Sequence, residues 1–176
     1  METVSKETVS MRETNWTPSR GAEGTLVARP AFAVRALKGL GQTLISGDLD
    51  AALKALVRGA PLIGLYEPAP RGKHALRIAR DRALLVTPAP IGAAEGWRET
   101  WCATSVDDGW VAVEVEGPDA GLVLMQGTSA DLMSGSPSTA LMFAGQRCLL
   151  ARTGAGFRLH VERPRLEALL AWLDEA

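Results

Sequence analysis

Cysteine, aromatic residues and net charge are all scarce in this sequence. Its two cysteines, Cys102 and Cys148, are too few for a disulfide framework and do not form a C-x-x-C pair. Free thiols are typical of a reducing compartment. No apolar run approaches the ~20 residues that span a bilayer, and no apolar leader segment is present at the N-terminus. We therefore expect a cytoplasmic protein with no membrane partner.

The charge balance argues against nucleic acid as a partner. The chain has 19 Lys and Arg against 20 Asp and Glu, for a net charge of −1. Such a balance creates no global positive field to attract a phosphate backbone. With 176 residues, 47% of them apolar, the chain is suited to one globular domain with a sizeable core.

The N-terminus differs in composition from the rest of the chain. Up to residue 23 its apolar residues are too sparse to form a helical face, and Thr17 to Gly21 are turn-formers. We predict a mobile tail over residues 1–28 and a single domain over residues 29–176. A tail that orders on a partner subunit is an alternative, and Met11 is an alternative first residue.

Hydrophobic spacing and turn residues predict the elements of the domain. Expected helices cover Pro30–Lys38, Asp48–Leu56, Ala120–Gln126 and Leu166–Leu173. Expected strands cover Leu62–Tyr66, Ala75–Ile78, Ala83–Thr87, Trp110–Val115, Cys148–Arg152 and Phe157–Val161. Hairpins mixed with single helices, without regular β-α alternation, predict an α+β fold with a mainly antiparallel sheet and helices packed on it.

Residues that could catalyse a reaction are few. Of the two histidines, His160 falls in an expected strand and His74 opens another, and a strand histidine is usually a sheet-face or surface residue. No histidine or cysteine cluster has the spacing of a metal site. The sequence therefore predicts no catalytic residue and no metal ligand, and leaves cofactor-binding residues unknown.

Two segments resemble parts of catalytic or nucleotide-binding motifs. Gly127-Thr128-Ser129 begins like a nucleophile elbow, but it follows a helix and lacks the closing glycine, so we expect Ser129 to cap a turn. Gly154-Ala155-Gly156 begins like a dinucleotide fingerprint, but a strand follows it, so we expect a hairpin turn and no bound nucleotide.

Two further groups of residues allow either a structural or a binding role. A local excess of positive charge could bind an acidic partner or an anionic ligand, or could prevent the edge of a solvated hairpin from pairing with another chain. The residues of this group are Arg71, Lys73, His74, Arg77, Arg80 and Arg82. Trp97, Trp101 and Trp110 lie close together and suit either a core or an interface.

The order of several turn and helix-start motifs resembles the sarcosine oxidase gamma subunit family. The motifs are Thr104-Ser105-x-Asp107-Asp108-Gly109, Gly117-Pro118-Asp119-Ala120, Asp131-Leu132, Phe143-Ala144-Gly145-Gln146-Arg147-Cys148, and Gly156 to Leu173. The likeness covers most of residues 62–173. More distantly, the sequence is similar to the folate-binding domain of the glycine-cleavage T-protein. The turn Ala79-Arg80-Asp81-Arg82 departs from the family, whose members usually carry a Gly-Pro-type turn there.

This resemblance implies a role in sarcosine catabolism and one-carbon metabolism. Heterotetrameric sarcosine oxidase demethylates sarcosine to glycine with tetrahydrofolate and O2. The alpha, beta and delta subunits would be the partners, and FAD, FMN, NAD, tetrahydrofolate and zinc would be held by subunits other than this one. The gamma subunit is implied to be a structural companion with no catalytic residue to carry over.

Two alternatives remain at the level of sequence. A stand-alone folate-binding, aminomethyltransferase-like protein would need a carboxylate to anchor the pterin, for which Asp107, Asp119 and Asp131 are candidates. An unrelated adaptor would use the basic hairpin or the N-terminal tail.

Overall fold

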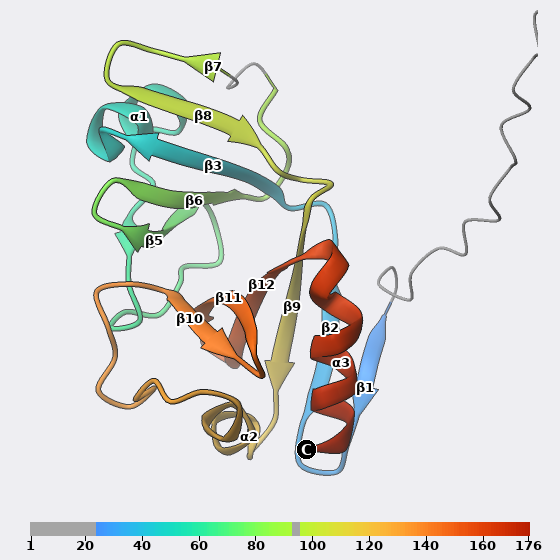
Figure 1. Cartoon of the computed structure of the whole chain (residues 1–176). Coiled ribbons are helices and arrows are strands. Elements are labelled where there is room, and N and C mark those ends of the chain that lie inside the picture. The colour runs from blue at the N-terminus through green and yellow to red at the C-terminus, as the bar shows by residue number, and fades with distance from the viewer. Residues whose placement is uncertain (1–23, 93–95) are drawn as a thin grey trace, which may run out of the picture.

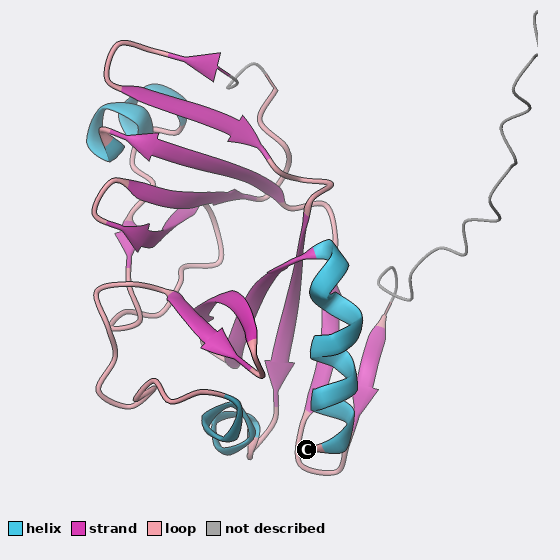
Figure 2. Ribbon diagram, in the orientation of Figure 1, coloured by secondary structure: helices cyan, strands magenta, loops and turns pink. Residues whose placement is uncertain are grey.

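The computed structural model describes residues 24–92 and 96–176, which form two six-stranded sheets and three α-helices (Figures 1 and 2). All strand pairs are antiparallel except the short parallel pair β4–β5. The expected α+β class is confirmed.

The first sheet combines strands from the N-terminal and C-terminal parts of the described chain. Its order is β1 (Thr25–Ala28), β2 (Ala33–Leu37), β9 (Trp110–Glu116), β12 (Gly156–Glu162), β11 (Gln146–Arg152) and β10 (Ala140–Phe143). Helix α2 (Ala120–Gly127) follows β9, and a 3₁₀ turn (Arg163–Arg165) leads from β12 into α3 (Leu166–Glu175).

The second sheet contains the middle of the chain. Its order is β4 (Leu62–Ile63), β5 (His74–Ala79), β6 (Arg82–Thr87), β3 (Gly41–Gly47), β8 (Trp101–Ser105) and β7 (Gly96–Trp97). Helix α1 (Leu49–Leu56) begins at Asp48, whose carboxylate accepts a hydrogen bond from the backbone N–H of Ala51 at 3.0 Å.

Three apolar clusters show that the sheets pack face to face between helices. One lies between the first sheet and helices α2 and α3, and includes the four leucines predicted for the last helix, Leu166, Leu169, Leu170 and Leu173. A second lies between the other sheet and α1. The third lies between the two sheets and comprises Ile63, Leu76, Leu84, Val86, Leu149 and Ala151. Strands β6 and β11 therefore bury both of their faces.

The helix expected over Pro30–Lys38 is wrong, because this segment contains β2. Val34 is fully buried opposite Val115 of β9, and alternate residues of β2 point to opposite faces. The structure also adds β3, the strand that joins β6 to β8, in a segment for which no strand was expected from the sequence. At Gly41 a Cβ atom would overlap the backbone oxygen of Ala89 and the hydroxyl of Thr87.

The expected domain boundary at residue 29 lies too late in the chain. Thr25–Ala28 form β1, which pairs with β2, and Val27 is buried in the largest cluster. The four residues are apolar enough to join the sheet, although they follow a polar segment. Residues 1–23 of the expected tail lie outside the described residues.

Candidate functional site

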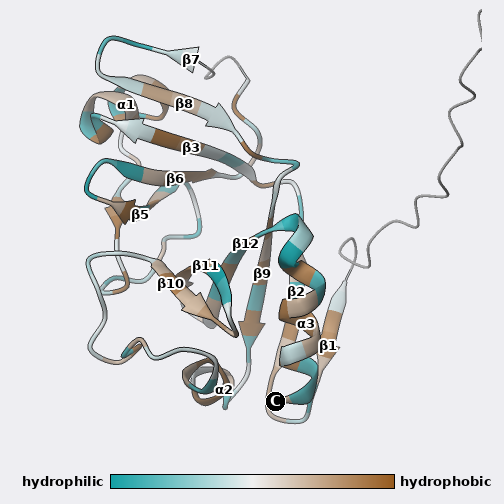
Figure 3. Cartoon of the chain, in the orientation of Figure 1, coloured by the Kyte–Doolittle hydropathy of each residue, from teal (hydrophilic) through white to brown (hydrophobic). Residues whose placement is uncertain are grey.

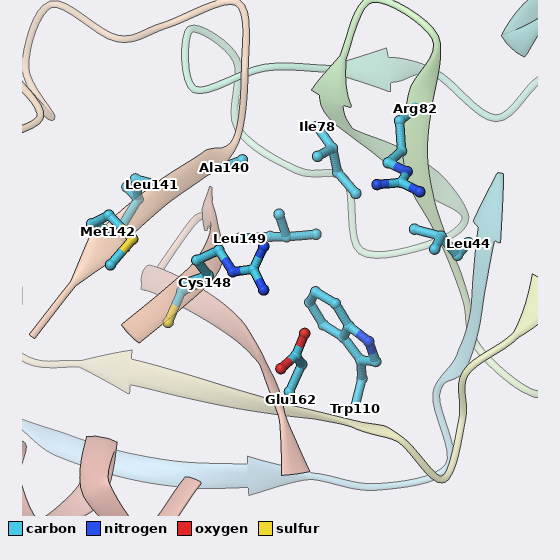
Figure 4. A pocket seen from close by; sticks show the side chains of 11 residues that line it. Leu44, Ile78, Arg82, Trp110, Ala140, Leu141, Met142, Cys148, Leu149 and Glu162 are labelled. Carbon is cyan, nitrogen blue, oxygen red and sulfur yellow. The ribbon is translucent and has the colours of Figure 1, made fainter. Parts of the chain in front are cut away.

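A cleft of about 440 Å³ lies between the two sheets (Figure 4). Strands of both sheets contribute its mostly apolar walls. The lining residues are Leu44, Ile78, Arg82, Trp110, Ala140, Leu141, Met142, Arg147, Cys148, Leu149 and Glu162. Size and apolar lining suit a small ligand or an inserted side chain of another protein.

Three charged residues, Arg82, Arg147 and Glu162, line the cleft. Figure 4 shows Arg82 and Glu162 with their polar ends directed into the space. Glu162 accepts a hydrogen bond from Nε of Arg165 at 2.8 Å, so its charge is partly compensated. Cys148 lies at the wall, and burial raises the pKa of its thiol to about 12. The thiol is therefore protonated at neutral pH and a weak nucleophile.

A buried polar cluster lies beside the apolar cluster that joins the sheets. Gln42 of β3 is its centre: the side-chain Nε2 donates to the backbone oxygen of Trp110 at 3.1 Å, and Oε1 lies 2.7 Å from Nδ1 of His160. His74 of β5 donates from Nδ1 to the backbone oxygen of Gly72 at 2.9 Å. Both histidines are fully buried.

These contacts determine the protonation of the two imidazoles. Because both Nδ1 atoms face oxygen acceptors, each carries the proton in the neutral ring, and each Nε2 is a buried acceptor with no hydrogen bond among the described residues. Burial, with smaller contributions from the charges of Arg158 and His74, lowers the pKa of His160 to about 3. Burial also lowers the pKa of His74. Both rings are therefore neutral at physiological pH.

An ion pair between Arg158 and Glu114 lies on the same face of the first sheet as His160. Nη2 of Arg158 donates to Oε1 of Glu114 at 2.6 Å, across the β12–β9 pairing that places these residues opposite each other. Their side chains are 13% and 20% exposed. Breaking this pair would leave a poorly hydrated charge.

Of the two positions expected for the histidines, a sheet face or the surface, the structure shows a buried sheet face. Leu159 and Val161 face the helices, so His160 faces the opposite side of β12, which the second sheet covers. Gln42, Glu114 and Arg158 are members of this cluster that were not predicted from the sequence. The apolar run of β6, Ala83–Val86, is the sequence signal that indicates cover on both faces of a sheet.

The two other groups of candidate residues are each divided by the fold. Arg71 and Lys73 are exposed at one end of the β5–β6 hairpin, while Arg80 and Arg82 are exposed at its turn. Of the tryptophans, Trp101 is in the core under α1, Trp110 lines the cleft, and Trp97 is 83% exposed. The tryptophans therefore form no single surface.

The partial motifs are structural turns, as expected, although the caps differ. The segment after α2 is a turn in which the hydroxyl of Thr128, rather than that of Ser129, accepts from the backbone N–H of Ala130 at 3.1 Å. Gly154 lies in the β11–β12 hairpin, closed by a hydrogen bond from Thr153 N to Gly156 O at 2.8 Å.

The three candidate pterin-anchoring aspartates do not converge. Asp107 accepts from the backbone N–H of Gln42 and from the hydroxyl of Ser105 in the loop before β9. Asp119 precedes α2. Asp131 accepts from Ser134 and Met133 in the loop after α2, and these hydrogen bonds lower its pKa.

No cluster of three or more metal-ligating His, Cys, Asp or Glu side chains occurs in residues 24–92 and 96–176. No helix in the same ranges is long and apolar enough to cross a membrane.

Comparison with solved structures identifies the fold. No protein-family model matches the sequence, and no curated protein matches it. The structure matches a chain of heterotetrameric sarcosine oxidase from Corynebacterium sp. U-96, solved in complex with pyrrole 2-carboxylate. The TM-score is 0.69 and the sequence identity 25%, over 85% of each chain. This match supports a sarcosine oxidase subunit family for the chain. The resemblance to a sarcosine oxidase subunit, which the order of the motifs indicated, is thereby confirmed.

Proposed function

We propose that this chain is a gamma-type accessory subunit of a heterotetrameric sarcosine oxidase-type complex, and that it completes and stabilises the complex without catalysing a reaction itself. The observation that best supports this proposal is the extent of the structural match, which covers 85% of this chain and 85% of a chain from such an enzyme. The likeness thus extends over a whole subunit rather than over a shared module of a larger one.

The positions of the reactive side chains support a noncatalytic role. Both histidines are fully buried between the sheets, where neither can reach a substrate in solution. Cys148 is buried and, with its raised pKa, protonated. General acid–base and nucleophilic catalysis require such groups within hydrogen-bond reach of a reacting atom.

In this proposal the chemistry is carried out by the partner subunits. The complex would demethylate sarcosine to glycine, transfer the one-carbon unit to tetrahydrofolate and reduce O2 to hydrogen peroxide. FAD, FMN, NAD and zinc would be bound by the alpha, beta and delta subunits. A gamma-type subunit contributes binding energy, which depends on apolar contact area and shape rather than on reactive groups.

The test is reconstitution with the larger subunits encoded by the same organism. We expect the tagged chain, co-expressed with alpha, beta and delta subunits, to co-purify in a fixed ratio by native mass spectrometry. Preparations lacking the chain should be less stable to heat than the complete complex. An active alpha–beta–delta assembly of unchanged stability, from which this chain elutes separately, would refute the proposal.

A further inference from the structure

One stretch of the surface carries almost no charge. Residues 120–146 contain a single charged side chain, Asp131, where the chain's average of 22% charged residues would place about six. The stretch comprises α2, the loop after it, β10 and the turn into β11. We call it the uncharged margin.

The uncharged margin exposes large apolar side chains. The three methionines that the structure describes are all in it and all exposed: Met125 by 45%, Met133 by 78% and Met142 by 52%. Leu122 of α2 is 61% exposed. Methionine is enriched at protein interfaces because its flexible, polarisable side chain adapts to a partner's surface.

The single charge of the uncharged margin is already compensated within the chain. Asp131 accepts hydrogen bonds from the backbone N–H groups of Met133 and Ser134 and from the hydroxyl of Ser134, at 2.8, 3.0 and 2.5 Å. Arg152 lies close enough to lower the pKa of this carboxyl further. Covering the margin with another protein would therefore leave no free charge without a partner.

The margin is continuous and is attached to both sheets. In Figure 1 α2, the loop and β10 follow one another along the lower left edge of the molecule, and Figure 3 shows β10 in the colours of apolar residues. Its loop is held to β5 of the second sheet by a hydrogen bond from Thr139 N to Arg77 O, and to the turn after β4 by one from Leu65 N to Ser136 O, both 2.7 Å. A surface held at both sides is preorganised for docking.

We infer that the uncharged margin is the surface by which this chain docks onto an apolar, charge-poor surface of a larger subunit of its own oxidase complex. The inference rests on the proposed function, and it names the contact region that the function requires. An uncharged partner surface is the electrostatic complement of a surface without free charge, since any unpaired charge on either side would lose its hydration.

Other occupants fit the margin less well. A surface that binds membranes combines apolar residues with Lys and Arg, and residues 120–146 contain neither. A second copy of the chain would offer equally apolar surface, but the structural relative is a chain of a heterotetramer, which favours a different subunit.

The test introduces one negative charge at exposed positions. Leu122→Glu and Met133→Glu, singly and together, add a carboxylate to the margin at side chains that contribute little to the core. Trp97→Glu is the matched control: Trp97 is 83% exposed on β7, at the opposite end of the molecule in Figure 1. Circular dichroism melting establishes that each isolated variant is folded.

We expect the double variant to bind the tagged alpha–beta–delta assembly about tenfold or more weakly than the wild type, and Trp97→Glu to bind like the wild type. Equal binding by the double variant and the wild type would overturn the assignment of the surface but leave the proposed function standing. No binding by the wild type would overturn both. A homodimer of the isolated chain that the double variant dissolves, with subunit binding unchanged, would assign the margin to a second copy instead.

Discussion

Mild acid should destabilise this protein through His160. The ring is neutral in the folded chain because its pKa is lowered to about 3, whereas an unfolded histidine has a pKa of about 6.5. Between pH 6.5 and pH 3 the unfolded state therefore binds more protons than the folded state. The free energy of unfolding must decrease as the pH falls through this window, and His160 contributes no pH dependence above it.

The size of the effect follows from the width of that window. At pH 4.5 the solution is two units below the unfolded-state pKa, and each unit corresponds to about 1.4 kcal/mol, so His160 alone removes roughly 3 kcal/mol. His74, whose pKa is also lowered chiefly by burial, acts in the same direction. Small domains are stable by about 5–15 kcal/mol in total, so this loss is readily measured.

The assay compares urea unfolding of the wild type and of His160→Asn at pH 7.5 and pH 4.5. The asparagine amide can replace the Nδ1–H group that donates to Oε1 of Gln42, but it does not titrate. The variant should be less stable at pH 7.5, because a smaller side chain fills the site less well. Its loss of stability between the two pH values should be smaller than that of the wild type by roughly 3 kcal/mol.

Parallel losses in the two proteins would refute the reasoning. A direct measurement covers the case in which the variant does not fold: an NMR titration of the histidine ring resonances in the folded wild type. We expect the His160 ring to stay neutral at pH 5, and protonation near pH 6.5 would show that burial between the sheets does not lower its pKa.

Two backbone predictions concern turns. Gly117 joins β9 to α2 at φ +130°, where a Cβ atom would lie 2.5 Å from the backbone oxygen of Ala31. Gly117→Ala should therefore lower the free energy of unfolding, measured in urea, by about 2–4 kcal/mol. A loss below about 0.5 kcal/mol would contradict this steric argument. Ala144 has φ +48° in the two-residue turn of the β10–β11 hairpin, followed by Gly145 at φ +73°. Because asparagine tolerates this conformation better, Ala144→Asn should raise the same quantity by about 0.5–1 kcal/mol, and a decrease would show that another contact of Ala144 outweighs the strain.

Local signals in the sequence predicted the elements whose ends they define. Asp48 caps α1, the turn at Gly154 joins β11 to β12, and leucines at helical spacing form the buried face of α3. β2 was mistaken for a helix because Pro30 and Gly39 resemble helix boundaries. Of its two partners, β1 fell in the segment expected to be a tail, and β9 lies far away in the sequence, where pairing leaves no local pattern to detect.

The candidate site was less predictable, because it depends on how the two sheets pack. Alternation along β12 correctly separates Leu159 and Val161 from His160, but nothing in that strand shows that a second sheet covers the histidine. Only the apolar runs of β6 and β11, buried on both faces, indicate the extra layer. The uncharged margin differs from the buried cluster in this respect. Its lack of charge is visible in the sequence, and only the exposure of its elements has to come from the structure.

The acid sensitivity and the docking surface are physically connected. The cluster that joins the sheets has six buried apolar residues, far fewer than the cluster beneath α2 and α3, so the contacts of Gln42 and His160 are a substantial part of what holds the sheets together. The loop of the uncharged margin is hydrogen-bonded to the second sheet at Arg77 and to the turn after β4 at Leu65, while α2 and β10 belong with the first sheet. Between pH 6.5 and pH 3 only chains in which this packing has opened take up the proton, so acid should raise the fraction of chains whose margin is no longer held on both sides. Binding to the larger subunits should in turn weaken over the same pH window in which the isolated chain loses stability, and less steeply for His160→Asn.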